Sequence, residues 1–487
     1  MEPIAGRKEE IAEMSNLLAS PRSEFLAVYG RRRVGKTFLI REVYKKDMVF
    51  QITGIAHVNM AHQLANFFTA FREANNRNTP ELQPPANWFE AFELLRHWLQ
   101  RGRQKKKVIF FDELPWIDTP RSNFLPALEH FWNSWASART DIILVVCGSA
   151  ASWMLNKLIH NKGGLHNRIT KRIPLSPFTL HETEDFFRLR NIDLDRYQII
   201  QLYMAMGGIP YYLNEIRPGV SAFQAIDKLC FTKGGLLTFE YDNLFSSLFE
   251  NAERHTAIVE ALATSPRGLI RPDIIAKTGL PDGGGLTRML EELEESGFIA
   301  RALPFEKKIR SGIYRLTDQY SLFYWHFIKE KKASGTGSWV SRLDSPSWRS
   351  WSGYAFENIC HLHIAQVKKA LGISGVYSET SSWVDRDREV QIDMLIDRRD
   401  HVISVCEVKF STGIYTIDRN YKAALERKIN VFKENTGTSK TVFLAMITTF
   451  GVKANIHSTG LIQNEIKMDD LFAARFFLWN NTLSSSY

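Results

Sequence analysis

The residues with the clearest chemical potential form a loop near the start of the chain. The loop fits the pattern G-x-x-x-x-G-K-[ST], and its members are Gly30, Arg31, Arg32, Arg33, Val34, Gly35, Lys36 and Thr37. An apolar run ending at Tyr29 precedes the loop and a helical pattern follows it, which is the context of a phosphate-binding loop. In such a loop, backbone N–H groups surround phosphate oxygens. We therefore predict that Lys36 binds the β and γ phosphates of ATP and that Thr37 binds Mg²⁺.

An acidic pair, Asp112 and Glu113, follows a second apolar run, Val108 to Phe111. A phosphate loop needs acidic residues at the tip of another strand, where they complete the site. We predict that Asp112 holds Mg²⁺ through water and that Glu113 orients and deprotonates the attacking water. A solvated acidic turn is the alternative.

Two further polar residues are candidates for the same site. Ser149 follows the apolar run Ile142 to Cys147 and is a candidate sensor of the γ phosphate, although small polar residues end many strands without a role. Arg168 is a candidate arginine finger that stabilises charge in the transition state. An arginine that faces solvent or binds a phosphate is an equal alternative.

A second group of chemical residues lies near the other end of the chain. Two strand-like runs, 389–397 and 402–410, are joined by residues 398–401. A turn centred between Arg399 and Asp400 places Asp393 opposite Cys406 and beside Glu407. The sequence thus predicts an antiparallel hairpin that carries two neighbouring carboxylates.

Glu407 and Lys409 share one face of their strand because they are two residues apart. Charges on an otherwise apolar face are costly to bury unless they pair or hold a metal ion. Upstream, Glu357 opens a helical segment and is placed to approach the same ion. Because all three carboxylates offer oxygen, Mg²⁺ or Mn²⁺ is the expected ion.

These residues require several units to position them. Apolar runs alternate with helical patterns up to about residue 177, which is typical of a parallel α/β sheet. The predicted units are an ATPase core at 1–178, a helical lid at 179–250, a winged helix at 251–330, a linker at 331–350 and a C-terminal α/β unit at 351–487.

The N-terminal motifs resemble those of AAA+ ATPases of the signal-transduction branch. The resemblance rests on Gly6-Arg7, the phosphate loop, Phe111 to Glu113 and Gly207 to Pro210. It is closest to prokaryotic members that carry a winged helix and a nuclease-like domain. It implies a five-stranded sheet with the loop after its first strand, and a nucleotide contact from Pro210. Ser149 departs from the Asn that many AAA+ proteins have there.

The C-terminal motif Asp393, then Glu407-Val408-Lys409, resembles the PD-(D/E)xK nuclease superfamily. The resemblance implies a restriction-endonuclease-like α/β fold in which Asp393, Glu407 and the upstream Glu357 bind Mg²⁺ and Lys409 positions or activates water. It also implies accessory positions at Tyr421 and Lys428. The alternative is a structural pair, Glu407 with Lys409, in a domain without activity.

The predicted winged helix is a poor DNA reader. Its third helix, about 285–296, carries Arg288 against four glutamates, a net charge of −3 that repels phosphates. We predict a packing module, or a contact site for a partner protein or a second copy. DNA contact is expected only through the wing, at Lys307, Lys308 and Arg310.

The composition of the chain excludes several other classes of protein. The 487 residues include 44% apolar and 24% charged residues, which excludes wholesale disorder. Neither a spanning apolar run nor an N-terminal signal is evident, and four scattered cysteines argue against a zinc ribbon, so we expect a cytoplasmic protein without a membrane partner. The net charge of +9 permits a polyanionic partner such as DNA.

The combined prediction is an ATP-hydrolysing AAA+ module coupled to a Mg²⁺-dependent DNA nuclease. The alternative is an ATPase signalling switch whose C-terminal domain is an inactive scaffold for nucleic acid or protein.

Overall fold

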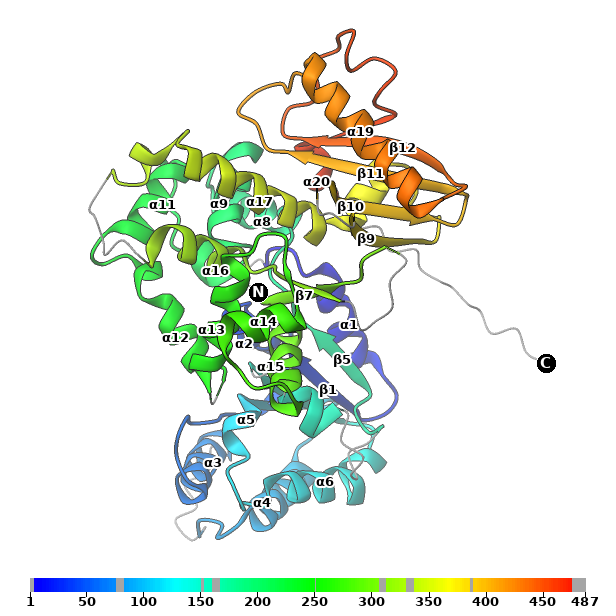
Figure 1. Cartoon of the computed structure of the whole chain (residues 1–487). Coiled ribbons are helices and arrows are strands. Elements are labelled where there is room, and N and C mark those ends of the chain that lie inside the picture. Colours follow the sequence, from blue (N-terminus) through cyan, green and yellow to red (C-terminus); the bar gives the residue numbers. More distant parts are fainter. Residues whose placement is uncertain are drawn as a thin grey trace, which may run out of the picture.

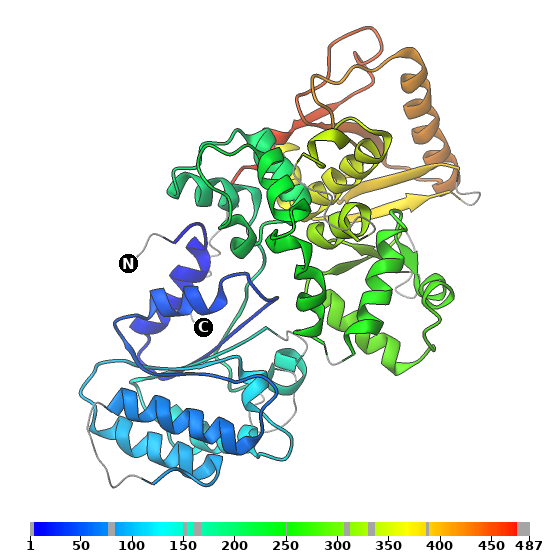
Figure 2. The same cartoon turned by 90° about the vertical axis from the view of Figure 1, so that its left-hand side faces the viewer.

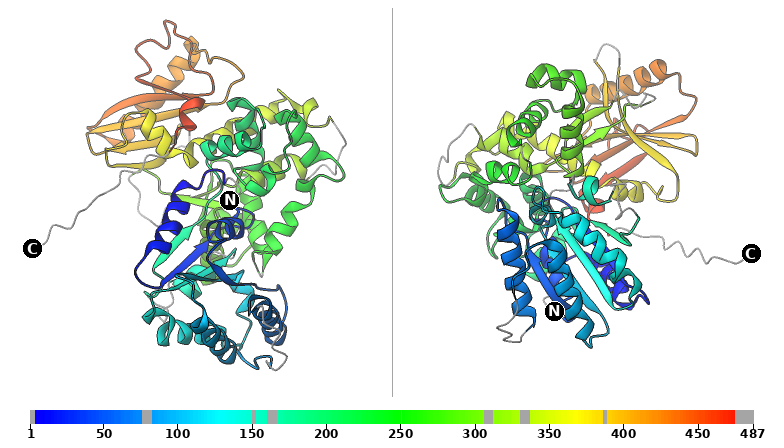
Figure 3. Two further views of the ribbon diagram at one scale, coloured as in Figure 1. Left: turned by 180° about the vertical axis from the view of Figure 1, so that it is seen from behind. Right: turned by 90° about the horizontal axis from the view of Figure 1, so that it is seen from below.

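The computed structural model describes residues 4–75, 83–149, 153–159, 167–249, 251–305, 312–329, 337–385 and 389–474. These residues form two five-stranded sheets and a smaller three-stranded sheet. The two large sheets lie toward opposite ends of the molecule and a mainly helical region lies between them (Figure 1; Figure 3).

The N-terminal sheet is entirely parallel, as predicted. Its strands are β1 (Glu24–Tyr29), β2 (Met48–Thr53), β3 (Lys107–Asp112), β4 (Ile142–Gly148) and β5 (Lys171–Pro174), in the spatial order β2-β3-β4-β1-β5. Strands β3 and β4 are buried along their whole length because helices cover both faces of the sheet.

Alternate side chains of β3 point into two different cores. Val108 and Phe110 join the core that includes residues of α1 (Lys8–Ala19) and α2 (Lys36–Val43). Ile109 and Phe111 join the core that includes residues of α3 (Met60–Asn75), α4 (Trp88–Arg101) and α6 (Phe124–Ser134). In Figure 2, α1 and α2 accordingly lie on one side of the sheet, and α3 and α4 lie on the other.

The helical region begins directly after this sheet. It comprises α8 (Leu180–Leu189), α9 (Arg196–Met206), α10 (Pro210–Leu213), α11 (Ala222–Phe231) and α12 (Glu240–Ser246). All residues of α9 from Ile199 to Met206 are buried, so this helix is the centre of the region.

The next segment, residues 251–305 and 312–329, is called here the hairpin segment. It contains α13 (Ala252–Ala263), β6 (Leu269–Ile270), α14 (Arg271–Thr278), α15 (Gly284–Glu295), β7 (Ile299–Ala302), β8 (Ile313–Leu316) and α16 (Gln319–Phe323). Its strands have the order β6-β8-β7. Three helices followed by a hairpin agree with the predicted pattern of elements, and the winged-helix assignment itself stays a prediction. The predicted basic wing residues Lys307, Lys308 and Arg310 lie outside the described residues.

The C-terminal unit is built on a mixed sheet with the order β13-β12-β11-β10-β9. Its elements are α17 (Pro346–Leu362), α18 (Ile364–Ala370), β9 (Ser378–Val384), β10 (Gln391–Arg398), β11 (Val402–Lys409), α19 (Arg419–Thr436), β12 (Thr441–Thr448), β13 (Asn464–Lys467) and α20 (Met468–Leu471). Helices α17 and α19 cover opposite faces of the sheet (Figure 1).

The start of this unit differs from the prediction. Helix α17 begins at Pro346, capped by Ser345, so Glu357 lies well inside the helix and does not open it. Part of the predicted linker is also packed: Trp339 is buried against Phe231, and its backbone N–H donates to Asp227 over 2.8 Å. The Gly/Ser-rich composition of the predicted linker gave no indication of these contacts of Trp339.

The register of the C-terminal hairpin differs from the prediction by one residue. Met394, rather than Asp393, lies opposite Cys406. The turn is centred on Asp400, and His401 ends it with a left-handed φ of 62°. Continued by one step, this register brings Asp393 level with Glu407.

None of the helices that the described residues form is both long and apolar enough to span a membrane.

Candidate functional site

The phosphate loop connects β1 to α2 in the conformation that its glycines allow. Gly30 has φ 142° and Gly35 has φ 90°, both in the region that favours glycine. A Cβ atom on Gly30 would overlap the backbone carbonyl of Leu175. The loop therefore depends on Gly30 for space as well as for conformation.

Lys36 is the first residue of α2, and its ammonium folds back over the loop. Its Nζ donates to the carbonyl oxygens of Gly30 and Arg31 over 2.8 and 2.9 Å, and to Ser149 Oγ over 3.1 Å. The side chain is only 5% exposed. A buried ammonium at a helix N-terminus creates positive potential where phosphates are expected to bind.

Thr37, the second residue of α2, contacts Asp112, the last residue of β3. The Thr37 hydroxyl lies 2.9 and 3.1 Å from the two carboxylate oxygens of Asp112, and it donates to this carboxylate. Burial and the neighbouring Glu113 raise the pKa of Asp112. The hydroxyl and carboxylate oxygens are the ligand types that Mg²⁺ prefers, so these two residues fit the predicted ion.

Ser149 binds the predicted general base. Its hydroxyl donates to Glu113 Oε1 over 2.6 Å, and its backbone N–H donates to Oε2 over 3.2 Å. Because Lys36 donates to the same hydroxyl, Ser149 connects the phosphate-binding ammonium to the carboxylate of Glu113. The structure thus brings all five predicted residues Lys36, Thr37, Asp112, Glu113 and Ser149 together.

The side chain of Arg31 points away from the phosphate loop and contacts the hairpin segment. Its Nη1 forms an ion pair with Asp318, and its guanidinium lies over the Phe298 ring at 4.7 Å. The side chains of both members of the ion pair are buried. The nucleotide loop therefore has a buried charged contact with a residue 287 positions away in the chain.

Arg33 makes a similar contact with the helical region. It forms an ion pair with Glu240 on α12, and its guanidinium lies 4.3 Å from the Tyr211 ring centroid. The Tyr212 hydroxyl donates to the same Glu240 over 2.9 Å. Since Tyr211 follows Pro210 directly, the structure places the predicted Gly-x-Pro segment beside the phosphate loop.

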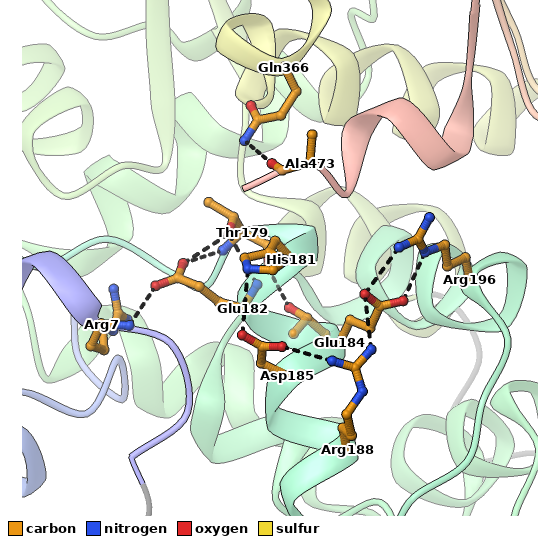
Figure 4. A network of polar contacts seen from close by, with 11 residues as sticks. Arg7, Thr179, His181, Glu182, Glu184, Asp185, Arg188, Arg196, Gln366 and Ala473 are labelled. Carbon is orange, nitrogen blue, oxygen red and sulfur yellow. Dashed lines mark hydrogen bonds and ion pairs between the residues drawn. The ribbon is translucent and has the colours of Figure 1, made fainter. Parts of the chain in front are cut away.

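The N-terminal Gly6-Arg7 turn also reaches this region. Arg7 Nη2 donates to the carbonyl oxygens of Val34 and Ser176 over 3.3 and 2.7 Å. Its backbone N–H donates to Glu182 Oε1, while the other oxygen of Glu182 accepts from the backbone of Thr179 (Figure 4). This turn therefore fixes the loop against the start of α8.

Two predicted residues have no visible role in the site. Arg32 is exposed in the loop, and Arg168 is exposed in the turn before β5. No hydrogen bond or ion pair within the described residues joins Arg168 to the phosphate loop. The arginine-finger role of Arg168 stays a prediction.

In the C-terminal unit, Glu407 is surrounded by donors. It accepts from Lys428 Nζ over 2.6 Å and from the Tyr421 hydroxyl over 2.7 Å, and Lys409 Nζ lies 3.0 Å away. Burial alone would raise its pKa, but Lys428 and Lys409 outweigh burial and lower the pKa of Glu407 to about 2. The resemblance stated in the sequence analysis had assigned all four residues to one site and its accessory positions.

Asp393 and Glu357 approach the same cluster. Burial and then the charge of Glu357 raise the pKa of Asp393, with a smaller contribution from Glu407. Glu357 Oε1 accepts from Arg315 Nη1 over 3.0 Å. We call Glu357, Asp393, Glu407 and Lys409 the carboxylate cluster.

The carboxylate cluster is occupied by protein cations in this arrangement. Arg315 neutralises Glu357, while Lys409 and Lys428 neutralise Glu407. Across the described part of the chain, no three Asp, Glu, His or Cys side chains are grouped closely enough to hold a metal ion. The cluster as arranged therefore does not fit the predicted Mg²⁺ site, and the metal roles of its residues stay predictions.

Sequence reasoning did not find the partners of the loop arginines, Asp318 and Glu240, or the partner of Glu357, Arg315. Asp318 had one local signal, because it is the residue that caps α16. Capping predicts a helix start and gives no indication of a contact with the phosphate loop.

The chain is similar in sequence or in structure to several known proteins. The uncharacterized protein MJECL04 of Methanocaldococcus jannaschii is 24% identical over 409 residues, which cover 83% of this chain and 87% of that protein. Among solved structures, the Walker-type ATPase PABY2304 of Pyrococcus abyssi matches with 17% identity and a TM-score of 0.47, covering 66% of this chain and 96% of that one. The ORC2 protein of Aeropyrum pernix matches with 14% identity and a TM-score of 0.39, covering 66% and 92%.

A family model described as an ATPase domain predominantly from Archaea matches residues 4–216. This range contains the phosphate loop, the acidic pair, Ser149 and Pro210. Residues 4–216, which form a parallel sheet with a phosphate loop, are therefore similar to ATPase domains of this archaeal type.

Proposed function

We propose that this chain binds and hydrolyses ATP with Mg²⁺, and that the nucleotide state changes how the helical region, the hairpin segment and the C-terminal unit are arranged. The observation that carries the proposal is the convergence of Lys36, Thr37, Asp112, Glu113 and Ser149 at the carboxyl ends of adjacent parallel strands. Ligands of open α/β sheets bind at this edge.

Each residue has a distinct task in hydrolysis. Lys36 binds phosphate oxygens, and Thr37 and Asp112 hold Mg²⁺, which supplies charge neutralisation when bound. Glu113 orients the attacking water and accepts its proton. Each oxygen of the Glu113 carboxylate can accept more than one hydrogen bond, so Glu113 can bind the attacking water while Ser149 still holds it.

An ATPase assay on matched variants tests this proposal. Asp112→Asn removes the carboxylate that faces Thr37 and should lower turnover at least a hundredfold. Asp118→Asn is the control, because Asp118 is a nearby partly buried acid without a contact to Thr37 or Lys36 among the described residues. Equal turnover in both variants would refute the assigned site.

A second candidate function, a nuclease acting on DNA, belongs to the C-terminal unit. It is favoured by one observation: Lys409 pairs with Glu407, the hairpin register sets Asp393 level with Glu407, and the charge of Glu357 on the neighbouring helix raises the pKa of Asp393. The neutralising cations mean that the proposal rests on the meeting of these residues and not on a metal geometry. A scaffold without activity is the alternative.

Incubation with plasmid and single-stranded DNA, with and without Mg²⁺, Mn²⁺ and ATP, separates these alternatives. A nuclease should cut at least one substrate, and Asp393→Asn should abolish the cut. Asp397→Asn is the matched control, because Asp397 lies on the same strand and pairs with Lys440 outside the cluster. No cleavage by the unmodified protein under any condition would support the scaffold.

A further inference from the structure

Two ion pairs, one partly buried and one buried, involve residues three positions apart in the chain and contact two different sites. Arg315, on β8, pairs with Glu357 of the carboxylate cluster, and Asp318, at the start of α16, pairs with Arg31 of the phosphate loop. Arg315 is 8% exposed and Asp318 is 5% exposed. Residues 315–319 are called here the relay segment.

The relay segment is fastened to α17 at more than one point. Besides the ion pair of Arg315, the carbonyl of Leu316 accepts from Asn358 Nδ2 over 2.9 Å, and Gln319 Nε2 donates to the carbonyl of Ala355 over 3.1 Å. Because α17 carries Glu357, a shift of the relay segment moves the environment of that carboxylate.

At its other end, the relay segment holds the phosphate loop through a fixed carboxylate. Asp318 Oδ2 caps α16 by accepting from the backbone N–H and the hydroxyl of Ser321 over 2.9 and 2.6 Å. Its Oδ1 faces Arg31. The cap fixes Asp318, so a change in its pairing with Arg31 acts on the start of α16.

The polar groups of this junction are incompletely satisfied. Arg31 Nε and Nη2, Arg315 Nε and Gln319 Oε1 are buried without a hydrogen-bond partner among the described residues. Buried donors without partners favour any alternative arrangement that supplies an acceptor. Arg31 directly follows Gly30 in the loop that surrounds phosphates, so a bound nucleotide can supply that acceptor.

We propose that the relay segment couples nucleotide binding at the phosphate loop to the carboxylate cluster. Nucleotide phosphate competes with Asp318 for Arg31, and the release of Asp318 shifts the relay segment and loosens the Arg315–Glu357 pair. The coupling rests on the proposed nucleotide binding, but it does not require nuclease activity. Coupling between two sites is reciprocal, so a change at Glu357 must alter nucleotide affinity.

A double-mutant cycle on nucleotide affinity tests the coupling. The probe is fluorescently labelled ADP, and the measured quantity is its Kd for the full chain. Glu357→Gln breaks the pair with Arg315 and should tighten ADP binding about fivefold or more, because Asp318 then holds Arg31 less firmly. In an Asp318→Asn background, the same Glu357→Gln change should have no further effect. Asp397→Asn, which breaks another ion pair of the C-terminal unit, should leave Kd unchanged.

The coupling is overturned if Glu357→Gln leaves the Kd unchanged, or if its effect persists in full in the Asp318→Asn background. If the unmodified chain binds no ADP or ATP, the proposed ATPase function itself fails. Hydrogen exchange of the unmodified chain provides a second test that does not depend on whether the variants fold. ADP should change the protection of residues 315–323 and 353–362 together, and a change confined to the phosphate loop would contradict the relay.

Discussion

Ser149 and Glu113 are joined by two hydrogen bonds, one of 2.6 Å from the serine hydroxyl and one of 3.2 Å from its backbone N–H. The predicted general base is thus held by the residue at the end of the neighbouring strand. Lys36 donates to the same hydroxyl, so a phosphate that attracts Lys36 also weakens the hold on Glu113.

This relationship predicts a positioning role for Ser149. Ser149→Ala leaves Glu113 without its hydroxyl partner, so we expect kcat for ATP to fall roughly ten- to a hundredfold with KM within about twofold. Ser149→Thr keeps the hydroxyl and should restore most of the activity. A Ser149→Ala enzyme with unchanged kcat would show that the contact has no part in turnover.

The geometry of the phosphate loop predicts that replacing Gly30 by alanine lowers both stability and nucleotide binding. Gly30→Ala places a Cβ against the Leu175 carbonyl at a φ of 142°, and we expect it to cost more than about 2 kcal/mol of stability and to abolish nucleotide binding. Gly353→Ala, inside α17 with open space around it, is the control and should be neutral or stabilising by up to about 1 kcal/mol. Thermal unfolding and ADP titration measure both effects.

The cations around Glu407 predict an acid-sensitive contribution to stability. Because the folded pKa of Glu407 is lowered from 4.5 to about 2, the unfolded chain binds more protons in this interval, and stability falls as the pH falls. The contribution is on the order of 3 kcal/mol above about pH 5 and is lost progressively toward pH 2. Thermal unfolding of wild type and Glu407→Gln from pH 7 to pH 3 should show the difference between them shrinking. A difference that is constant over this range would contradict the assigned pairing.

The acidic face of α15 predicts that this helix does not read DNA. The helix buries Leu286, Met289, Leu290 and Leu293, as their spacing predicted, and leaves Arg288 exposed beside glutamates. Arg288→Ala should therefore leave the DNA affinity of the chain within about twofold, measured by fluorescence anisotropy at fixed salt. A sequence-specific footprint that Arg288→Ala abolishes would overturn this prediction.

The sequence predicted the parallel sheet and the proximity of the motif residues well because both depend on local signals. The apolar run that ends at Tyr29 became β1, and the runs 108–111 and 142–147 became β3 and β4 with bounds within one residue. The motif spacing placed Lys36, Thr37, Asp112 and Glu113 at one sheet edge. Parallel strands bring their carboxyl ends together, so motif residues at those ends must meet.

What the sequence did not predict depends on long-range contacts or on a single backbone conformation. The Arg31–Asp318 pair joins residues 287 positions apart, and neither residue has a local pattern that indicates the other. The hairpin register depended on the left-handed conformation of His401, which an Asp-His turn permits but does not dictate. Trp339 reads as part of a polar linker until its contacts with Phe231 and Asp227 are known.

Glu113→Gln tests the central claim most directly. The change keeps the size of the side chain but removes the base, so the variant should bind ATP with an affinity close to that of the wild type and hydrolyse it at least a hundredfold more slowly in a single-turnover experiment. Lys36→Ala should instead lose nucleotide binding altogether, because the loop then lacks its phosphate-binding cation. Retained hydrolysis in Glu113→Gln, or a loss of ATP affinity equal to that of Lys36→Ala, would contradict the account.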